Sequence, residues 1–193
     1  MQSVCVFCGS HPGVRPAYRA AAVRLGAALA ERGLGLVYGG ASTGLMGAVA
    51  DAALASGGKV HGVLPEFMIA REVAHRGLTT LQLVGSMHER KAAMAAHADA
   101  FVALPGGFGT LEELFEVLTW AQLGLHRKPC ALLDVDGYYE PLVVFLDRAV
   151  SEGLLRPEYR AMLFVESDPA RLVERLAGHV PPPVERVLEP SQT

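Results

Sequence analysis

The sequence predicts a single-domain, Rossmann-like α/β fold: a doubly wound, mostly parallel sheet of about seven strands with helices on both faces. Two observations predict this fold. Short apolar segments alternate along the chain with longer segments whose apolar residues recur at helical spacing. Glycine-rich turns directly follow three of the apolar segments, as they do where a doubly wound sheet binds its ligand.

Seven segments are short and apolar, as buried parallel strands are. They cover residues 4–7, 34–38, 59–64, 80–84, 100–104, 130–134 and 162–165. Helical periodicity marks the stretches 17–32, 45–55, 87–98, 111–125, 139–152 and 169–177. Because right-handed crossovers bring the carboxyl ends of parallel strands to one edge, the loops after the first, second and fifth strands should converge on one crevice.

Length and composition predict one domain over residues 1–179, followed by a proline-rich C-terminal tail at 180–193. The chain has 193 residues, 51% of them hydrophobic, which is enough for one sizeable core. Residues 181–183 are three successive prolines, which favour an extended segment.

Charge, hydropathy and cysteine content exclude several classes of partner. A net charge of -3 without a dense basic cluster argues against binding a nucleic acid polymer. No apolar run reaches the roughly 18 residues that a membrane span needs, so we expect no membrane contact. Three cysteines, without a recognisable leader segment, favour a reducing, cytoplasmic location over a disulfide framework. Cys5 and Cys8 have CxxC spacing, but no second pair completes a metal site, so we expect buried thiols and no bound metal.

The most informative segment is the turn at 105–113, Pro-Gly-Gly-Phe-Gly-Thr-Leu-Glu-Glu, between an apolar strand and a helix. Three glycines in four positions let the backbone approach a ligand, and the free amides of a helix start favour an anion. The turn therefore predicts a site for a sugar phosphate or nucleotide. Thr110 and Glu113 also have the spacing of a helix-capping box. Glu113 could thus cap its own helix or face a ligand.

A second helix start carries unusual charges. Ser86 and Glu89 form another capping pair, so Arg90 and Lys91 fall near the amino-terminal end of that helix, where the dipole disfavours cations. This placement suggests that they serve an anion. The alternative is a pair of solvated charges on a surface helix, which is the commoner case.

Two further glycine-rich turns could add phosphate contacts through the residues Gly9, Ser10, Gly39, Gly40, Thr43 and Gly44. Leu45 stands where a P-loop needs lysine, which disfavours nucleoside triphosphate hydrolysis. Glu112 stands where a dinucleotide fingerprint after Gly107 and Gly109 needs its third glycine, which disfavours hydride transfer.

The turn at 105–113 matches the PGGxGTxxE signature of the LONELY GUY family, the cytokinin riboside 5'-monophosphate phosphoribohydrolases formerly called lysine decarboxylases. The segment 87–91, Met-His-Glu-Arg-Lys, matches that family's other hallmark. The resemblance extends over residues 4–10, the Gly39-Gly40 turn and residues 120–139. It implies hydrolysis of the N-glycosidic bond of AMP or an N6-substituted AMP to free base and ribose 5-phosphate, without a cofactor.

By this resemblance, Arg90 and Glu113 are the catalytic pair. A carboxylate at Glu113 would stabilise an oxocarbenium-like transition state or orient water, and Arg90 would act as an electrostatic clamp. The implied substrate contacts are Glu72, Met87, Lys91, Gly106, Gly107, Phe108, Gly109, Thr110, Leu111, Glu112 and Thr119. The family also implies a homodimer whose subunits complete each other's pockets.

Two other functions remain open on the sequence. The family is similar to molybdenum-cofactor carrier proteins, which implies a non-catalytic carrier of a phosphorylated ligand as the alternative. A pyridoxal-phosphate decarboxylase would need a lysine for the Schiff base, and the chain offers only Lys59, Lys91 and Lys128.

Overall fold

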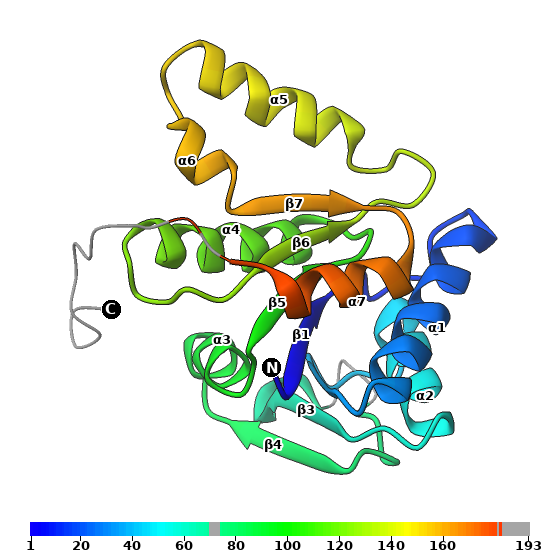
Figure 1. Ribbon diagram of the computed structural model, residues 1–193. Helices are drawn as coiled ribbons and strands as arrows, with labels where there is room; N and C mark the ends of the chain where they lie inside the picture. Colours follow the sequence, from blue (N-terminus) through cyan, green and yellow to red (C-terminus); the bar gives the residue numbers. More distant parts are fainter. Residues whose placement is uncertain (70–73, 181, 183–193) are drawn as a thin grey trace.

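We analysed a computed structural model of the chain, which describes residues 1–69, 74–180 and 182. Seven strands form one sheet in the order β4-β3-β2-β1-β5-β6-β7, and each neighbouring pair runs parallel (Figure 1). The strands are β1 Ser3–Phe7, β2 Gly35–Tyr38, β3 Val60–Pro65, β4 Thr80–Val84, β5 Ala100–Ala103, β6 Cys130–Leu133 and β7 Leu163–Glu166. The predicted seven-stranded α/β fold is confirmed.

Helices cover both faces of this sheet (Figure 1). On one face pack α1 (Pro16–Glu31), α2 (Gly44–Ala55) and α7 (Pro169–Gly178). On the other pack α3 (Met87–Ala96), α4 (Phe108–Gln122) and α5 (Glu140–Ser151). Two short helices complete the described chain: the 3-10 turn η1 (Glu66–Met68) and α6 (Pro157–Arg160). None of the helices among the described residues has the length and apolarity to cross a membrane.

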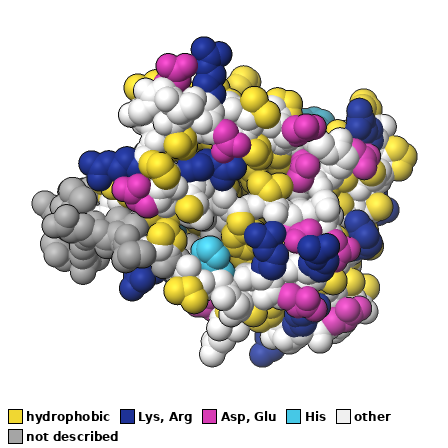
Figure 2. Space-filling view, turned by 45° about the horizontal axis from the view of Figure 1, so that its top comes forward, with side chains coloured by type: hydrophobic (Ala, Val, Ile, Leu, Met, Phe, Trp, Pro, Cys, Tyr) yellow, Lys and Arg dark blue, Asp and Glu magenta, His cyan; other side chains and the backbone are white. Residues whose placement is uncertain are grey.

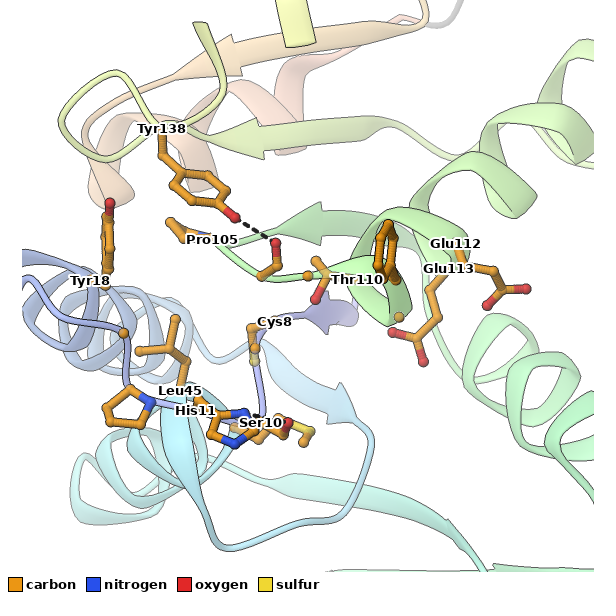
Figure 3. A pocket seen from close by; sticks show the side chains of 18 of the residues that line it. Cys8, Ser10, His11, Tyr18, Leu45, Pro105, Thr110, Glu112, Glu113 and Tyr138 are labelled. Atoms are coloured by element: carbon orange, nitrogen blue, oxygen red, sulfur yellow. Dashed lines mark hydrogen bonds between the residues drawn. The ribbon is translucent and has the colours of Figure 1, made fainter. Parts of the chain in front are cut away.

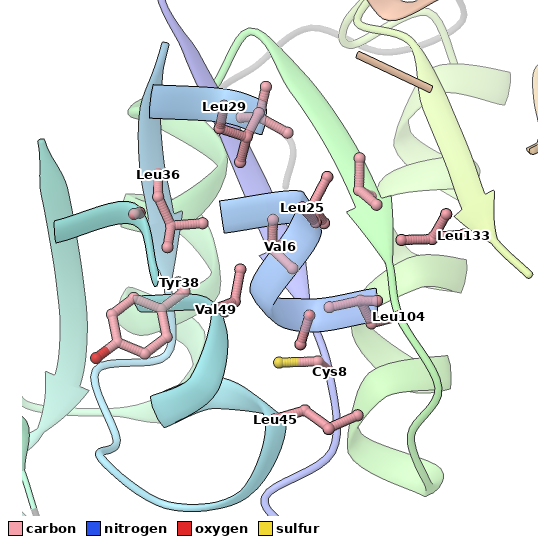
Figure 4. Close-up of a cluster of buried hydrophobic side chains, with 14 of the residues drawn as sticks. Val6, Cys8, Leu25, Leu29, Leu36, Tyr38, Leu45, Val49, Leu104 and Leu133 are labelled. Atoms are coloured by element: carbon pink, nitrogen blue, oxygen red, sulfur yellow. The ribbon is translucent and has the colours of Figure 1, made fainter. Parts of the chain in front are cut away.

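The alternation of side chains along the central strands builds two separate cores. In β1, Val4 and Val6 join the core under α1, α2 and α7, whereas Cys5 and Phe7 join the opposite one. Figure 4 shows the first core, where Leu25 and Leu29 of α1 pack over the strands. Cys5, Cys8 and Cys130 are buried free thiols, as predicted. Burial on both faces explains why the strands read as continuous apolar runs.

The chain changes direction across the sheet between β1 and β5. From β1 it winds outward through β2 and β3 to β4, then returns to place β5 on the other side of β1. Val4 to Phe7 of β1 pair in register with Ala100 to Ala103 of β5. The loops that leave these two strands therefore diverge, which opens a crevice at their carboxyl ends.

The structure differs from the predicted helices at the start of α4 and in two short additional elements. Helix α4 begins at Phe108 and not near Thr110, because Gly107 is its N-cap residue. The elements η1 and α6 span 3 and 4 residues and were not predicted, since no apolar periodicity can show in so few positions. The proposed tail at 180–193 lies almost wholly outside the described residues.

The surface carries both signs of charge. On the face drawn in Figure 2, Lys and Arg side chains are interspersed with Asp and Glu over the helices, with apolar side chains between them.

Candidate active site

A pocket of about 440 Å³ opens at the carboxyl ends of β1 and β5. Its walls come from the loop after β1, the amino-terminal ends of α1 to α4, and the loop after β6 (Figure 3). Predicted site residues on these walls are Gly9, Ser10, Met87, Arg90, Gly106, Gly107, Phe108, Gly109, Thr110, Glu112 and Glu113. The crevice expected from the strand order is thus present, and it brings the two charged candidates, Arg90 and Glu113, into one pocket.

The amino-terminal end of α4 forms one wall, and its N-cap residue is a glycine. Gly107 is the N-cap residue, without a side-chain hydrogen bond, so Thr110 lies inside the first turn. The predicted capping box of Thr110 and Glu113 is therefore wrong, because a capping box needs its Ser or Thr at the N-cap and its Glu at the third helical position, whereas Thr110 is the third helical residue and Glu113 the sixth. Glu113 is the sixth residue of the helix. Glu113 therefore does not occupy the position from which a capping-box glutamate bonds its own helix start.

The glycines of this turn have two different structural reasons. A Cβ on Gly106 would lie 2.0 Å from Thr110 Oγ1 and 2.9 Å from the Gly9 nitrogen, so only glycine fits this contact. A Cβ on Gly107 or Gly109 would meet no described atom within 4 Å. These two positions leave the backbone bare on the pocket wall, where the first amides of α4 are available to an anion.

Adjacent glutamates on α4 point in different directions. Figure 3 shows Glu113 extending toward the loop that carries Cys8 and Ser10, whereas Glu112 turns away from it. The Glu112 carboxylate accepts a hydrogen bond from Lys91 Nζ at 2.5 Å, and Glu116, one turn further along α4, accepts another at 2.9 Å. Lys91 thus bridges α3 to α4 and does not reach the pocket wall.

Arg90 is buried, with 6% of its surface exposed, which is rare for an arginine. Its Nη2 donates to the Gly39 carbonyl at 3.3 Å, and its Nη1 lies 3.8 Å from Met87 Sδ. Within the described part of the chain, its buried Nε has no hydrogen-bond partner. A buried guanidinium with a spare donor on a pocket wall is suited to an anionic ligand.

The pKa of the Cys8 thiol is affected by two opposite charges of this site. Burial raises the pKa of Cys8 most, the negative charge of Glu113 raises it further, and the positive charge of Arg90 lowers it. The same two charges act on Cys5 beneath it. The charges of Glu113 and Arg90 therefore both act at the end of β1, although α4 and α3 supply them separately.

Ser86 confirms the predicted cap of α3. Its hydroxyl accepts a hydrogen bond from the Glu89 amide at 3.1 Å, and the Glu89 carboxylate accepts one from the Gly85 amide at 2.9 Å. The glutamate reaches one residue further back than in a capping box. This cap fixes the start of α3 and hence the position of Arg90.

Several predicted residues lie away from the pocket. Thr119 donates to the Phe115 carbonyl at 2.7 Å and lines a separate apolar groove, and Leu111 faces the core under α4. The residues Gly39, Gly40, Thr43 and Gly44 are absent from the described pocket wall. Glu72 lies outside the described residues.

Packing within the protein accounts for the glycines at 39–44. A Cβ on Gly39 would meet Arg90, one on Gly40 would meet Leu64, and one on Gly44 would lie 2.3 Å from the Ser10 backbone. Gly40 and Gly44 also have positive φ values of 81° and 61°. This turn packs against Arg90 and against the loop after β1, and so helps to hold both in place at the pocket.

The structure also adds pocket residues that the sequence did not single out as site residues. Tyr138, from the loop after β6, donates its hydroxyl to the Gly106 carbonyl at 2.6 Å (Figure 3). Tyr18 of α1 contacts the Tyr138 ring edge to face, with centroids 5.6 Å apart. His11, Leu45 and Met46 complete the wall opposite α4. The position of Tyr138 after a strand end was the only available signal, since its contacts are long-range.

None of the three lysines lies on the pocket wall. Lys59 is exposed beside the start of β3, Lys91 is paired with two glutamates, and Lys128 donates to the Ala95 carbonyl at 2.8 Å. The described residues hold no group of three or more His, Cys, Asp or Glu side chains placed to bind a metal ion.

Comparison with known proteins identifies relatives over most of the chain. The family described as "Possible lysine decarboxylase" matches residues 46–176. The rice protein "Probable cytokinin riboside 5'-monophosphate phosphoribohydrolase LOGL5" is 53% identical over 180 residues, which are 93% of this chain and 73% of the rice protein. The Arabidopsis thaliana "Cytokinin riboside 5'-monophosphate phosphoribohydrolase LOG7" is 51% identical over 92% of this chain and 82% of its own length.

Among solved structures, the molybdenum cofactor binding protein from Rippkaea orientalis is similar, with a TM-score of 0.70 and 20% sequence identity. The match covers 92% of this chain and 97% of that one. At this identity the likeness shows a shared fold.

Proposed function

This chain belongs to the LONELY GUY family, which the description "Possible lysine decarboxylase" also covers, and we propose that it is a nucleoside 5'-monophosphate phosphoribohydrolase. Its substrate would be a cytokinin riboside 5'-monophosphate, as in the names of its plant relatives, and we take this to be AMP with a substituent on N6. The products would be the free base and ribose 5-phosphate. One observation carries the proposal: Glu113 and the buried Arg90 line one pocket beside an uncapped helix start.

The phosphate would bind at the amino-terminal end of α4. There the amides of Phe108, Gly109 and Thr110 have no carbonyl one turn earlier within the helix, and the N-cap residue Gly107 has no side chain that could bond them. The helix dipole also favours an anion at this end. Substrate bound in this way would place its ribose along the first two turns of α4, toward Glu113.

Cleavage breaks the bond between the anomeric carbon and the base nitrogen, and water supplies the new oxygen on that carbon. Positive charge develops on the ribose ring before the water bond is complete. The Glu113 carboxylate would stabilise this charge and accept one proton from the attacking water, whose OH stays on the anomeric carbon. The departing base takes up one proton at nitrogen from solvent, and Glu113 returns its proton to solvent, so the net reaction consumes one water. A guanidinium is a poor proton donor, so Arg90 would stabilise negative charge on phosphate or base and would not transfer a proton.

The two alternatives have less support. A carrier of a phosphorylated ligand rests on structures about 20% identical, which share the fold, whereas the phosphoribohydrolases are about 50% identical. A pyridoxal-phosphate decarboxylase would need a lysine at the pocket, and all three lysines lie elsewhere.

We propose further that the enzyme is a cytoplasmic homodimer, with the second copy seated over α4 and α5. Helix α5 buries only Leu146, while Val144 and Phe145 are 62% and 64% exposed. The apolar groove beside α5 includes Leu118 and Thr119. A second copy on this face would bring Thr119 of one subunit toward the pocket of the other subunit. Thr119 could then contact substrate there, although it lies away from the pocket of its own chain.

The test is direct: purified protein is incubated with AMP and with isopentenyladenosine 5'-monophosphate, and free base is measured by chromatography. Release of adenine or isopentenyladenine with equimolar ribose 5-phosphate supports the proposal. No base release from either nucleotide, with unchanged ligand recovered from the protein, contradicts it and favours the carrier. Light scattering on the same sample measures the mass, for which a dimer predicts twice 20.5 kDa.

A further inference from the structure

Three successive backbone carbonyls at the end of β5 are held by donors from other parts of the chain. The Leu104 carbonyl accepts from the Tyr139 hydroxyl at 2.6 Å, the Pro105 carbonyl from the Gly9 amide at 3.1 Å, and the Gly106 carbonyl from the Tyr138 hydroxyl at 2.6 Å. The turn before α4 is therefore fixed by the loops after β1 and β6.

A held carbonyl also fixes the direction of the following amide. The peptide unit is planar and trans, so the C=O of one residue and the N–H of the next point in opposite directions. The bond from Tyr138 thereby fixes the direction of the Gly107 N–H, and the bond from Gly9 fixes the direction of the Gly106 N–H. The bond from Tyr139 fixes the direction of no N–H group, because the residue after Leu104 is a proline, which has none.

The Gly107 amide is available to a ligand. Gly107 lies on the pocket wall, and no described atom would come within 4 Å of a Cβ placed there. Among the residues that the structure describes, none accepts a hydrogen bond from its N–H. This amide adjoins the first-turn amides of α4, to which the proposed function assigns the phosphate.

Resting on that proposed function, we infer that Tyr138 is a positioning residue for phosphate binding: its hydroxyl turns the Gly106–Gly107 peptide so that the Gly107 N–H donates to the phosphate. Tyr138 makes no phosphate contact in this role. It acts through the backbone, and it lets the enzyme favour a nucleoside monophosphate over the phosphate-free nucleoside.

The hydroxyl can be removed without removing the ring. Tyr138 is 39% exposed, and its ring contacts Tyr18 and Tyr139 edge to face at 5.6 Å and 5.0 Å. Tyr138→Phe keeps these contacts and deletes only the bond to Gly106. The matched control is Tyr139→Phe, which deletes a bond of equal length to Leu104 and leaves no amide misdirected.

Calorimetric titration with ribose 5-phosphate, with adenosine as the phosphate-free ligand, tests the inference without requiring turnover. We expect Tyr138→Phe to bind ribose 5-phosphate about tenfold more weakly, the usual worth of one hydrogen bond to a charged group, with adenosine affinity unchanged. Tyr139→Phe should lower the melting temperature and keep the wild-type affinity for ribose 5-phosphate. Wild-type affinity for ribose 5-phosphate in Tyr138→Phe, or an equal loss for both ligands, would overturn the inference.

A second measurement uses the wild-type protein and so does not depend on a variant that folds. In amide NMR spectra, saturating ribose 5-phosphate should shift the Gly107 resonance strongly. An unmoved Gly107 resonance in a protein that binds ribose 5-phosphate would contradict the inference. Failure of the proposed function appears differently: ribose 5-phosphate would then not bind, or no base would be released from nucleotide.

Discussion

Arg90 lies so close to Gly39 that a methyl group on the glycine would fall 2.0 Å from the arginine Nη2. Gly39 directly follows β2, and its carbonyl accepts a hydrogen bond from the same nitrogen. The end of β2 thus supplies both the space and the partner that hold Arg90 at the pocket.

Gly39→Ala should displace Arg90 and reduce turnover about 100-fold, the usual cost of losing one preorganised charge interaction. The backbone of Gly39 does not have a positive φ, so alanine causes no backbone strain there. Steady-state release of free base measures the effect, and thermal melting checks the fold.

Gly178→Ala is the matched control for this substitution. Gly178 ends α7, and no atom of the described residues, apart from its chain neighbours and the backbone of its own helix, lies within 4 Å of its Cβ position. Its turnover should equal that of the wild type. Equal activity of Gly39→Ala and Gly178→Ala would show that Arg90 does not need its observed position.

Lys91→Met should destabilise the protein by about 1–2 kcal/mol at neutral pH, because it breaks the bridge to Glu112 and Glu116. Burial lowers the pKa of Lys91, but hydrogen bonds and charges from both glutamates outweigh it, so the pKa is raised. The stabilisation is therefore fully present below the ordinary value of 10.5 and lost as the pH rises above it. Urea unfolding at pH 7 and at high alkaline pH measures this, and a difference between the proteins that persists in alkali would contradict it.

Asp99→Ala should show the opposite dependence on pH. Its carboxylate accepts hydrogen bonds from the Gln2 and Ser3 amides, and these bonds lower the pKa of Asp99 from its ordinary value of 3.8. The wild type should be more stable by about 1 kcal/mol above pH 3.8, and the difference should vanish in stronger acid. Melting temperatures of both proteins, measured across this pH range, test the prediction. A difference between them that does not change in acid would contradict a stabilising role of the hydrogen bonds to the charged carboxylate.

Tyr38→Phe should leave stability unchanged or increase it by up to about 1 kcal/mol. Tyr38 is fully buried, and its hydroxyl has no hydrogen-bond partner among the described residues. Removing an unpaired polar atom from a core relieves its desolvation cost. A loss of more than about 1 kcal/mol in denaturant unfolding would show that the hydroxyl is paired in solution.

The sheet could be predicted from the sequence because each strand is buried on both faces, which leaves a continuous apolar run such as Val102 to Leu104. The convergence of the loops after β1 and β5 followed from topology alone. The start of α4 could not be predicted, since Gly107 and Gly109 permit several backbone paths and Thr110 offers a false cap.

Residues of the candidate pocket could be predicted where their signal is local and not where it depends on long-range contacts. Arg90 and Glu113 stand out within their own segments. The bond from Tyr138 to Gly106 joins residues 32 positions apart, and the space for Arg90 depends on Gly39, 51 positions away. A local sequence pattern cannot show contacts between residues so far apart in the chain. The packing role of the glycines at 39–44 could not be predicted for the same reason, because their packing partners lie on other elements.

The central claim is that Glu113 acts on substrate and does not cap its helix, and Glu113→Gln tests it most directly. Base release from isopentenyladenosine 5'-monophosphate is measured beside Glu31→Gln, an equal charge change at the last residue of α1. We predict that Glu113→Gln loses at least about 100-fold in turnover at an unchanged melting temperature, while Glu31→Gln keeps wild-type activity. Wild-type turnover in Glu113→Gln, or a loss of activity that only follows unfolding, would contradict the account.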